Sequence, residues 1–155
     1  MCVHKSILLI LLLFSSVASS STDEKMREIL TSAYGESESY ENFFYKLQNA
    51  LVAVDVKKIA KLNSYPIRVN FESGTEYYKT EKEFIINYSK IVTAEMLSRV
   101  QSQKFSELFV NSYGMHIGYG DIWFGGHCVG KTSGKECDEV IISVTAYNVN
   151  HVKSK

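Results

Sequence analysis

Residues 113–124 read YGMHIGYGDIWF, and this stretch decides the fold that we expect. Two short apolar runs, 115–117 and 122–124, flank a segment that contains Gly118, Gly120 and Asp121. Glycine adopts positive φ at little steric cost, so such a segment suits the tight connection between two antiparallel strands. The stretch therefore predicts a β-hairpin in the C-terminal third of the chain.

Further strands are expected on both sides of this hairpin. Residues 140–147 read VIISVTAY and are rich in the β-branched side chains that favour strands. Their period of two predicts two faces, one with Ile142, Val144 and Ala146 and the other with Ile141, Ser143 and Thr145. Residues 67–71 alternate in the same way, and residues 76–79 follow as a short return strand.

Helical periodicity dominates the N-terminal half. Apolar residues recur at helical spacing over 26–33, 43–54, 59–62, 84–92 and 96–100. Ser39, Asp55, Thr80 and Thr93 precede four of these segments, where a side-chain oxygen can cap the first free backbone N–H groups. Helices grouped at one side of an antiparallel sheet predict an α+β fold, and no linker divides residues 21–155.

Two cysteines, Cys128 and Cys137, flank a polar loop after the hairpin. In an exported chain they are best interpreted as one disulfide, which would stabilise the fold by roughly 2–3 kcal/mol. They lie near the ends of two strands that we expect to be adjacent and antiparallel, where a cross-bridge is geometrically easy. A metal site is the alternative, but these cysteines and His127 fall short of four zinc ligands. We therefore expect no metal and no cofactor.

The N-terminus has the features of an export signal. Lys5 precedes the apolar run 7–14, and small residues follow at 15–20. A transmembrane helix needs about 20 apolar residues, so we expect cleavage after Ala18 or Ser20 and no stable membrane anchor. Residues 1–20 are thus predicted to be a signal peptide, residues 21–155 a single domain, and the mature protein periplasmic or secreted. A buried N-terminal helix is the alternative interpretation of the apolar run.

The charge of the mature chain excludes a general attraction to nucleic acid. Lys5 is the only charged residue among residues 1–20, so the 17 basic side chains become 16, against 17 acidic ones. A net charge near zero creates no field that would hold a polyanion. No nucleic-acid partner is expected.

The hairpin sequence also resembles that of a known family. Residues 113–126, YGMHIGYGDIWFGG, are similar to a Gly-x-x-Ile-Gly-x-Gly-x-Ile-Trp-Phe signature of small exported bacterial proteins in the NTF2-like, cystatin-like superfamily. Residues 43–69 are similar to the helix–helix–Tyr-Pro-Ile/Leu-Arg-Val pattern of the same proteins. The resemblance spans most of residues 40–150 and implies N-terminal helices packed on a curved antiparallel sheet, which forms a cone, and dimerisation through the sheet face. It implies no particular reaction, because the superfamily includes isomerases, dehydratases, binding modules and immunity proteins.

Three side chains are candidates for acid–base chemistry inside such a cone: Asp55, His116 and Asp121. A buried carboxylate has a raised pKa and can exchange protons near neutrality. Structural roles are nevertheless favoured, with Asp55 as a helix cap and Asp121 as a turn residue. Alternation along its strand puts His116 on the outer face, away from Met115 and Ile117. The sequence contains no Ser-His-Asp, phosphate-loop or metal-binding motif.

The aromatic side chains indicate binding instead. The chain has ten tyrosines and one tryptophan, residues that offer rigid contact area with one polar tip each. We expect Tyr88, Tyr113 and Trp123 to contribute to a binding site, while core packing explains at least half of the aromatic residues.

Two functions stay open at this point. The favoured one is a non-catalytic binding or protein-interaction module, of inhibitor or immunity type, that holds a partner protein or a small ligand. The alternative is a small pocket enzyme of the isomerase or dehydratase kind, in which Asp55 or His116 carries a proton. A deep pocket with a buried carboxylate would favour the enzyme, whereas a filled cone would favour the interaction module.

Overall fold

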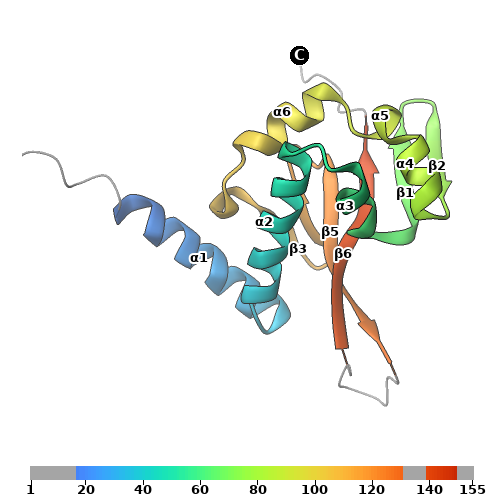
Figure 1. The fold of residues 1–155 in the computed structure, drawn as a ribbon. Helices are drawn as coiled ribbons and strands as arrows, with labels where there is room; N and C mark the ends of the chain where they lie inside the picture. Colours follow the sequence, from blue (N-terminus) through green and yellow to red (C-terminus); the bar gives the residue numbers. More distant parts are fainter. Residues whose placement is uncertain (1–16, 131–138, 150–155) are drawn as a thin grey trace, which may run out of the picture.

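The computed structural model describes residues 17–130 and 139–149, with side chains from residue 22 onward (Figure 1). The helices are α1 (Val17–Tyr34), α2 (Glu38–Val52), α3 (Val56–Lys61), α4 (Glu81–Ile86), α5 (Tyr88–Ile91), α6 (Ala94–Ser102) and the 3-10 helix η1 (Phe105–Glu107). The strands are β1 (Asn63–Phe71), β2 (Gly74–Tyr78), β3 (Phe109–Asn111), β4 (Gly114–Ile117), β5 (Ile122–Val129) and β6 (Glu139–Asn148).

The six strands form one open, mixed sheet, and the predicted α+β architecture is confirmed. The strand order is β2-β1-β6-β5-β4-β3, and β4 and β5 form the antiparallel hairpin that the glycine-rich stretch predicts. The expectation of a purely antiparallel sheet is wrong for one pair, because β6 lies beside β1 in parallel. The order of the elements explains this parallel pair. Helices α4, α5 and α6 connect β2 to β3, so that β3 runs in the same direction as β2. The strands β3 to β6 then alternate in direction, and β6 runs parallel to β1.

The helices cover one face of the sheet, which we call the inner face; the opposite face is the outer face. Phe43 of α2 stacks on Phe124 of β5 with ring centroids 5.3 Å apart, and Phe84 of α4 packs on Tyr147 of β6 at 5.4 Å. Figure 1 shows α2 and α3 in front of the C-terminal strands, with β5 and β6 extending beyond the others as a two-stranded ribbon. Alternation along the strands thus separates the side on which these helices pack from the side on which none of the described helices packs.

A β-bulge changes the face that two residues of β6 occupy. Alternation predicts Ala146 on the same face as Val144, but the register shifts between Trp123 and Phe124, so that Ala146 pairs with Trp123 and Tyr147 pairs with Ile122. The extra residue turns Ala146 to the outer face and Tyr147 into the core, where Tyr147 is fully buried. Because of the bulge, the large side chain of Tyr147 fills the core where alternation would place the small side chain of Ala146.

Three of the four predicted helix caps are confirmed, whereas the prediction for Ser39 is wrong, because α2 starts at Glu38 and its N-cap residue is Ser37. The side chain of Asp55 accepts a hydrogen bond from the backbone N–H of Lys58 at the start of α3. Thr80 accepts in the same way at α4, and Thr93 accepts from the N–H of Met96 at α6. These caps satisfy backbone donors that the helices leave free, so they fix where each helix starts.

Some expectations fall on parts of the chain that the structure does not describe. The predicted signal peptide includes residues 1–16, and Cys137 belongs to residues 131–138, both outside the described residues. Cys128 lies on β5 opposite Val140 of β6. The pairing of the two cysteines and the removal of residues 1–20 therefore stay predictions. Within the described ranges, no helix combines the length and the apolar character that a membrane crossing requires.

Candidate functional site

Three aromatic rings meet on the outer face of the sheet. Phe109 of β3, His116 of β4 and Trp123 of β5 are direct cross-strand neighbours. The Phe109 ring stacks on the imidazole at 4.7 Å between centroids, and the Trp123 ring lies 4.9 Å from it on the other side. Phe109 and Trp123 also contact each other edge to face at 6.3 Å. We call these three residues the aromatic cluster.

The aromatic cluster is part of a row that crosses all six strands. Trp123 pairs with Ala146 of β6, Ala146 with Arg68 of β1, and Arg68 with Tyr77 of β2. Phe109 is 47% exposed and Tyr77 is 60% exposed, at the two edges of the sheet. Among the residues of this row, Arg68 alone carries a fixed charge. The outer face thus presents apolar rings with a basic side chain beside them.

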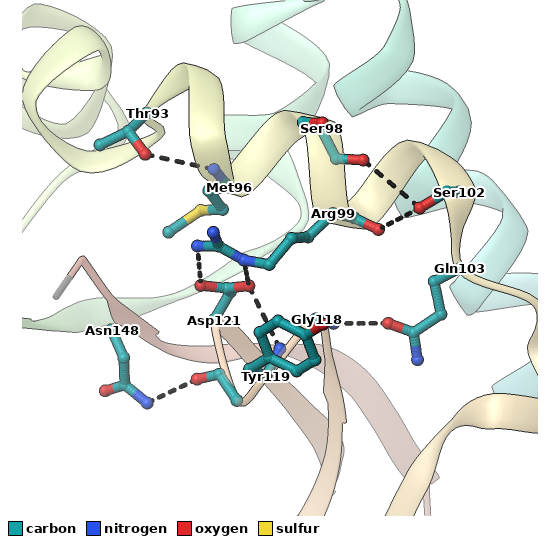
Figure 2. A network of polar contacts seen from close by, with 11 residues as sticks. Thr93, Met96, Ser98, Arg99, Ser102, Gln103, Gly118, Tyr119, Asp121 and Asn148 are labelled. Atoms are coloured by element: carbon teal, nitrogen blue, oxygen red, sulfur yellow. Dashed lines mark hydrogen bonds and ion pairs between the residues drawn. The ribbon is translucent and has the colours of Figure 1, made fainter. Parts of the chain in front are cut away.

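A second constellation ties the β4–β5 turn to α6. Asp121 is completely buried, and its two carboxylate oxygens accept hydrogen bonds from Nε and Nη2 of Arg99, each at 2.7 Å (Figure 2). This bidentate pair raises the pKa of the Arg99 guanidinium. A buried carboxylate requires such a partner, because desolvation of an unpaired charge is costly.

Two further side chains hold the turn. Gln103 accepts the backbone N–H of Gly118 through its Oε1 atom, and Asn148 of β6 donates from Nδ2 to the carbonyl of Gly120 at 2.6 Å. A Cβ atom on Gly118 would lie 2.0 Å from Oδ2 of Asp121, and Gly118 has a φ of +70°. Only glycine fits at this position, because any side chain would collide with the buried carboxylate.

A shallow cavity lies beside this turn. Its volume is about 290 Å³, and its lining consists of Arg99, Ser102, Gln103, Glu107, Gly118 and Tyr119. The Tyr119 side chain is 78% exposed, and the Arg99 guanidinium carbon lies 5.9 Å from its ring centroid. Figure 2 shows the Tyr119 ring below the ion pair, with Gln103 facing Gly118. We call this the turn cavity.

The inner face contains tyrosines instead of an acid–base pair. Tyr147 donates to Oδ1 of the buried Asn63 at 2.9 Å, and the Tyr65 hydroxyl donates to the carbonyl of Ala60 at 2.8 Å. Burial raises the pKa of Tyr147 well above the ordinary tyrosine value of 10.0, and burial also raises the pKa of Tyr88. These hydroxyls are protonated at neutral pH, and large side chains occupy the space where a pocket enzyme would hold its substrate.

Of the three acid–base candidates, Asp55 and His116 lie outside this interior. Asp55 is exposed, and its carboxylate caps α3. His116 lies on the outer face, as alternation predicts, with its ring packed against Phe109 and Trp123. Asp121, interpreted from the sequence as an ordinary turn residue, instead forms the buried pair with Arg99.

The predicted binding residues do not form one site. Trp123 belongs to the aromatic cluster on the outer face, whereas Tyr88 packs against Phe84 on the side of the helices at 6.2 Å. The Tyr88 hydroxyl is buried and finds no hydrogen-bond partner among the described residues. Tyr113 lies in the turn between β3 and β4 and is 87% exposed. In the described part of the chain, no group of His, Cys, Asp or Glu side chains has the arrangement of a metal site.

Sequence reasoning missed four residues that build these constellations. These residues are Phe109, Arg99, Gln103 and Asn148. The signal for Phe109 was present, because antiparallel pairing of residues 108–110 with the hairpin would place its ring beside His116. Arg99 and Asn148 meet the turn only through tertiary packing, and no local pattern in their segments indicates it.

Comparison with known proteins adds no relative. No family model matches the chain, no curated protein matches it, and no solved structure matches it. The NTF2-like resemblance therefore stays an expectation.

Proposed function

We propose that this protein is a non-catalytic interaction module that binds a partner protein through the aromatic cluster on the outer face of its sheet. One observation carries the proposal: Phe109, His116 and Trp123 stand together on the outer face, and Phe109 keeps 47% of its surface exposed. Clustered aromatic side chains that remain accessible are the residue types that dominate binding energy at protein interfaces.

The environment of the aromatic cluster fits a protein partner. The three rings pack on each other, so their orientation is set before binding and little side-chain entropy is lost. Arg68 and Tyr77 lie on the same row and supply polar contacts at its far end. Apolar rings with polar side chains beside them supply the two kinds of contact that protein interfaces combine.

The pocket-enzyme alternative receives less support. Its proton carrier would be Asp55 or His116, but Asp55 is occupied as a helix cap and the His116 ring lies between two other rings on the outer face. The interior of the sheet is filled by fully buried side chains such as Phe84, Phe124 and Tyr147. A filled interior leaves an acid or base without a substrate to act on.

The test is a quantitative capture experiment with single variants. Mature protein is immobilised and exposed to extract from the cell envelope and the medium of the source cells, and bound proteins are quantified by mass spectrometry. We expect a partner that binds the native protein and binds Phe109→Ala roughly tenfold more weakly, because an exposed aromatic anchor is lost. Binding should be unchanged in Tyr113→Ala, a matched control because Tyr113 is 87% exposed in the adjacent turn.

Two results would contradict the proposal. One is a captured set that is the same for the native protein and for Phe109→Ala. The other is a partner that depends on Tyr113 and not on Phe109. Circular dichroism of each variant establishes that the fold is retained, so that a loss of binding can be assigned to the missing ring.

A further inference from the structure

We propose that the turn cavity binds a single neutral sugar residue, either free or at the end of a glycan. The cavity of about 290 Å³ lies between the C-terminal end of α6, η1 and the β4–β5 turn. Small-ligand sites begin at about 300 Å³, so its size suits one ring and not a large ligand. This site is separate from the aromatic cluster, and it would add a second ligand to the proposed protein partner.

The atoms that line the cavity match the chemistry of a polyhydroxylated ring. Sugar hydroxyls both donate and accept hydrogen bonds, so they need partners of both kinds. Glu107 offers Oε1 as an acceptor, because its Oε2 already accepts a backbone N–H. Gln103 offers the second N–H of its amide, because the first donates to the carbonyl of Glu107. The Ser102 hydroxyl donates to backbone carbonyls of its own helix and can still accept a hydrogen bond. The exposed Tyr119 ring supplies the apolar surface on which the C–H face of a sugar can pack, and its hydroxyl supplies a polar tip.

Charge disfavours ionic ligands at this cavity. The only cationic side chain of the lining, Arg99, is already engaged by both oxygens of Asp121. An anion would also meet the carboxylate of Glu107, and a cation would meet the guanidinium of Arg99. The two lining charges have opposite sign, so a neutral molecule with many hydroxyls is the ligand that meets no like charge.

The structure holds this site in a fixed geometry. The Tyr119 backbone N–H donates to Oδ2 of Asp121 at 3.3 Å, and the neighbouring Gly118 N–H donates to Gln103. The buried ion pair therefore fixes the backbone from which the exposed Tyr119 ring projects (Figure 2). A backbone that is fixed before binding loses little entropy when a ligand arrives, which compensates for the small contact area of one sugar.

The test is a titration of the mature protein with defined probes. The panel contains glucose, galactose, mannose, N-acetylglucosamine and short oligosaccharides that end in each of them, with inorganic phosphate and a simple primary amine as charged comparators. Binding is measured by calorimetry and by saturation-transfer NMR. We expect at least one sugar to bind saturably in the millimolar range, and neither charged probe to compete with it.

Three variants locate the binding. Tyr119→Ala should weaken the sugar roughly tenfold, because it removes the stacking surface and leaves the fold unchanged, as expected for an exposed side chain. Glu107→Gln, which keeps the shape and removes the charge, should weaken it severalfold. Tyr113→Ala is the matched control and should bind as the native protein does.

Several results would overturn the inference. It fails if no sugar of the panel binds saturably, if Tyr119→Ala binds as well as Tyr113→Ala, or if phosphate or the amine competes with the sugar. Phe109→Ala separates this inference from the proposed function, since that variant should keep sugar binding even where it loses the protein partner. Stronger binding to the oligosaccharides than to free sugars would indicate a glycan terminus, and equal binding would indicate a free sugar.

Discussion

Neighbouring residues of the same strand have different surroundings on the two faces of the sheet. Phe124 and Trp123 are consecutive residues of β5, yet Phe124 is fully buried against α2 whereas Trp123 stands on the outer face beside His116. On the inner face aromatic rings complete a core, whereas on the outer face Phe109 stays 47% exposed and His116 and Trp123 are half-buried. The difference shows that the face of the strand, and not aromatic content alone, decides whether a ring is buried in the core.

The largest expected effect follows from truncating the inner face. Phe124→Ala should lower the free energy of unfolding by about 3–5 kcal/mol, because it leaves a cavity beneath Phe43 in a core that cannot collapse around it. Urea unfolding monitored by circular dichroism measures this change. A loss below about 1 kcal/mol would show that the inner face is loosely packed, and the contrast between the faces would fail.

The second prediction concerns the buried ion pair at the edge of this core. Asp121→Asn should lower the free energy of unfolding by about 3 kcal/mol. This is the lower end of the range for breaking a buried ion pair, because the Arg99 side chain keeps 27% of its surface exposed. The amide cannot neutralise the guanidinium that remains. Urea unfolding of Asp121→Asn measures the change.

A double-mutant cycle with Arg99→Met isolates the pair from the rest of the turn. We expect the loss in the double variant to be smaller than the sum of the two single losses. Additive losses would mean that the carboxylate acts through its hydrogen bonds to the turn backbone, and not through Arg99.

Local patterns predicted the parts of the fold that depend on local physics. The caps at Asp55, Thr80 and Thr93 follow from side-chain oxygens that precede apolar periodicity, and all three are confirmed. Alternation placed Met115 and Ile117 in the core and His116 outside it. Each of these inferences needs only residues a few positions apart.

Features set by distant segments could not be predicted in this way. The bulge that exchanges Ala146 for Tyr147 in the core arises from pairing between β5 and β6, and it is invisible in the alternation of β6 alone. Arg99 and Asp121 are 22 residues apart and meet because α6 packs over the turn. The turn residue with a structural role could be recognised, but its partner on another element could not.

The third prediction concerns the stability of the protein at alkaline pH, which depends on the buried Tyr147 of the inner face. Above pH 10 an exposed tyrosine of the unfolded chain ionises, while Tyr147 stays protonated because burial raises its pKa well above 10.0. Unfolding then releases a proton. The contribution of this group to the free energy of unfolding is therefore fully present below pH 10, and it is lost as the pH rises above 10. Each such group lowers the free energy of unfolding by up to about 1.4 kcal/mol per pH unit.

Tyr147→Phe gives the matched measurement. This variant loses the hydrogen bond to Asn63, which costs about 1 kcal/mol at neutral pH, but it has one fewer proton to release. Urea unfolding between pH 9 and pH 11 should therefore show a shallower decline for Tyr147→Phe than for the native protein, since about one proton fewer is released. Parallel declines would indicate that Tyr147 ionises as readily in the folded protein as in the unfolded chain.

The smallest expected change in stability concerns Phe109 on the outer face. It tests whether the aromatic cluster serves the fold or is available for binding. Phe109→Ala should cost less than about 1 kcal/mol, because its ring is 47% exposed and no cavity forms when it is removed. Phe124→Ala removes the same side chain from the opposite face and provides the matched comparison in the same unfolding assay. If Phe109→Ala were as destabilising as Phe124→Ala, the aromatic cluster would be a structural element of the sheet. A near-neutral Phe109→Ala means that its exposed ring area contributes little to folding, which leaves contact with a partner as the role that this area can serve.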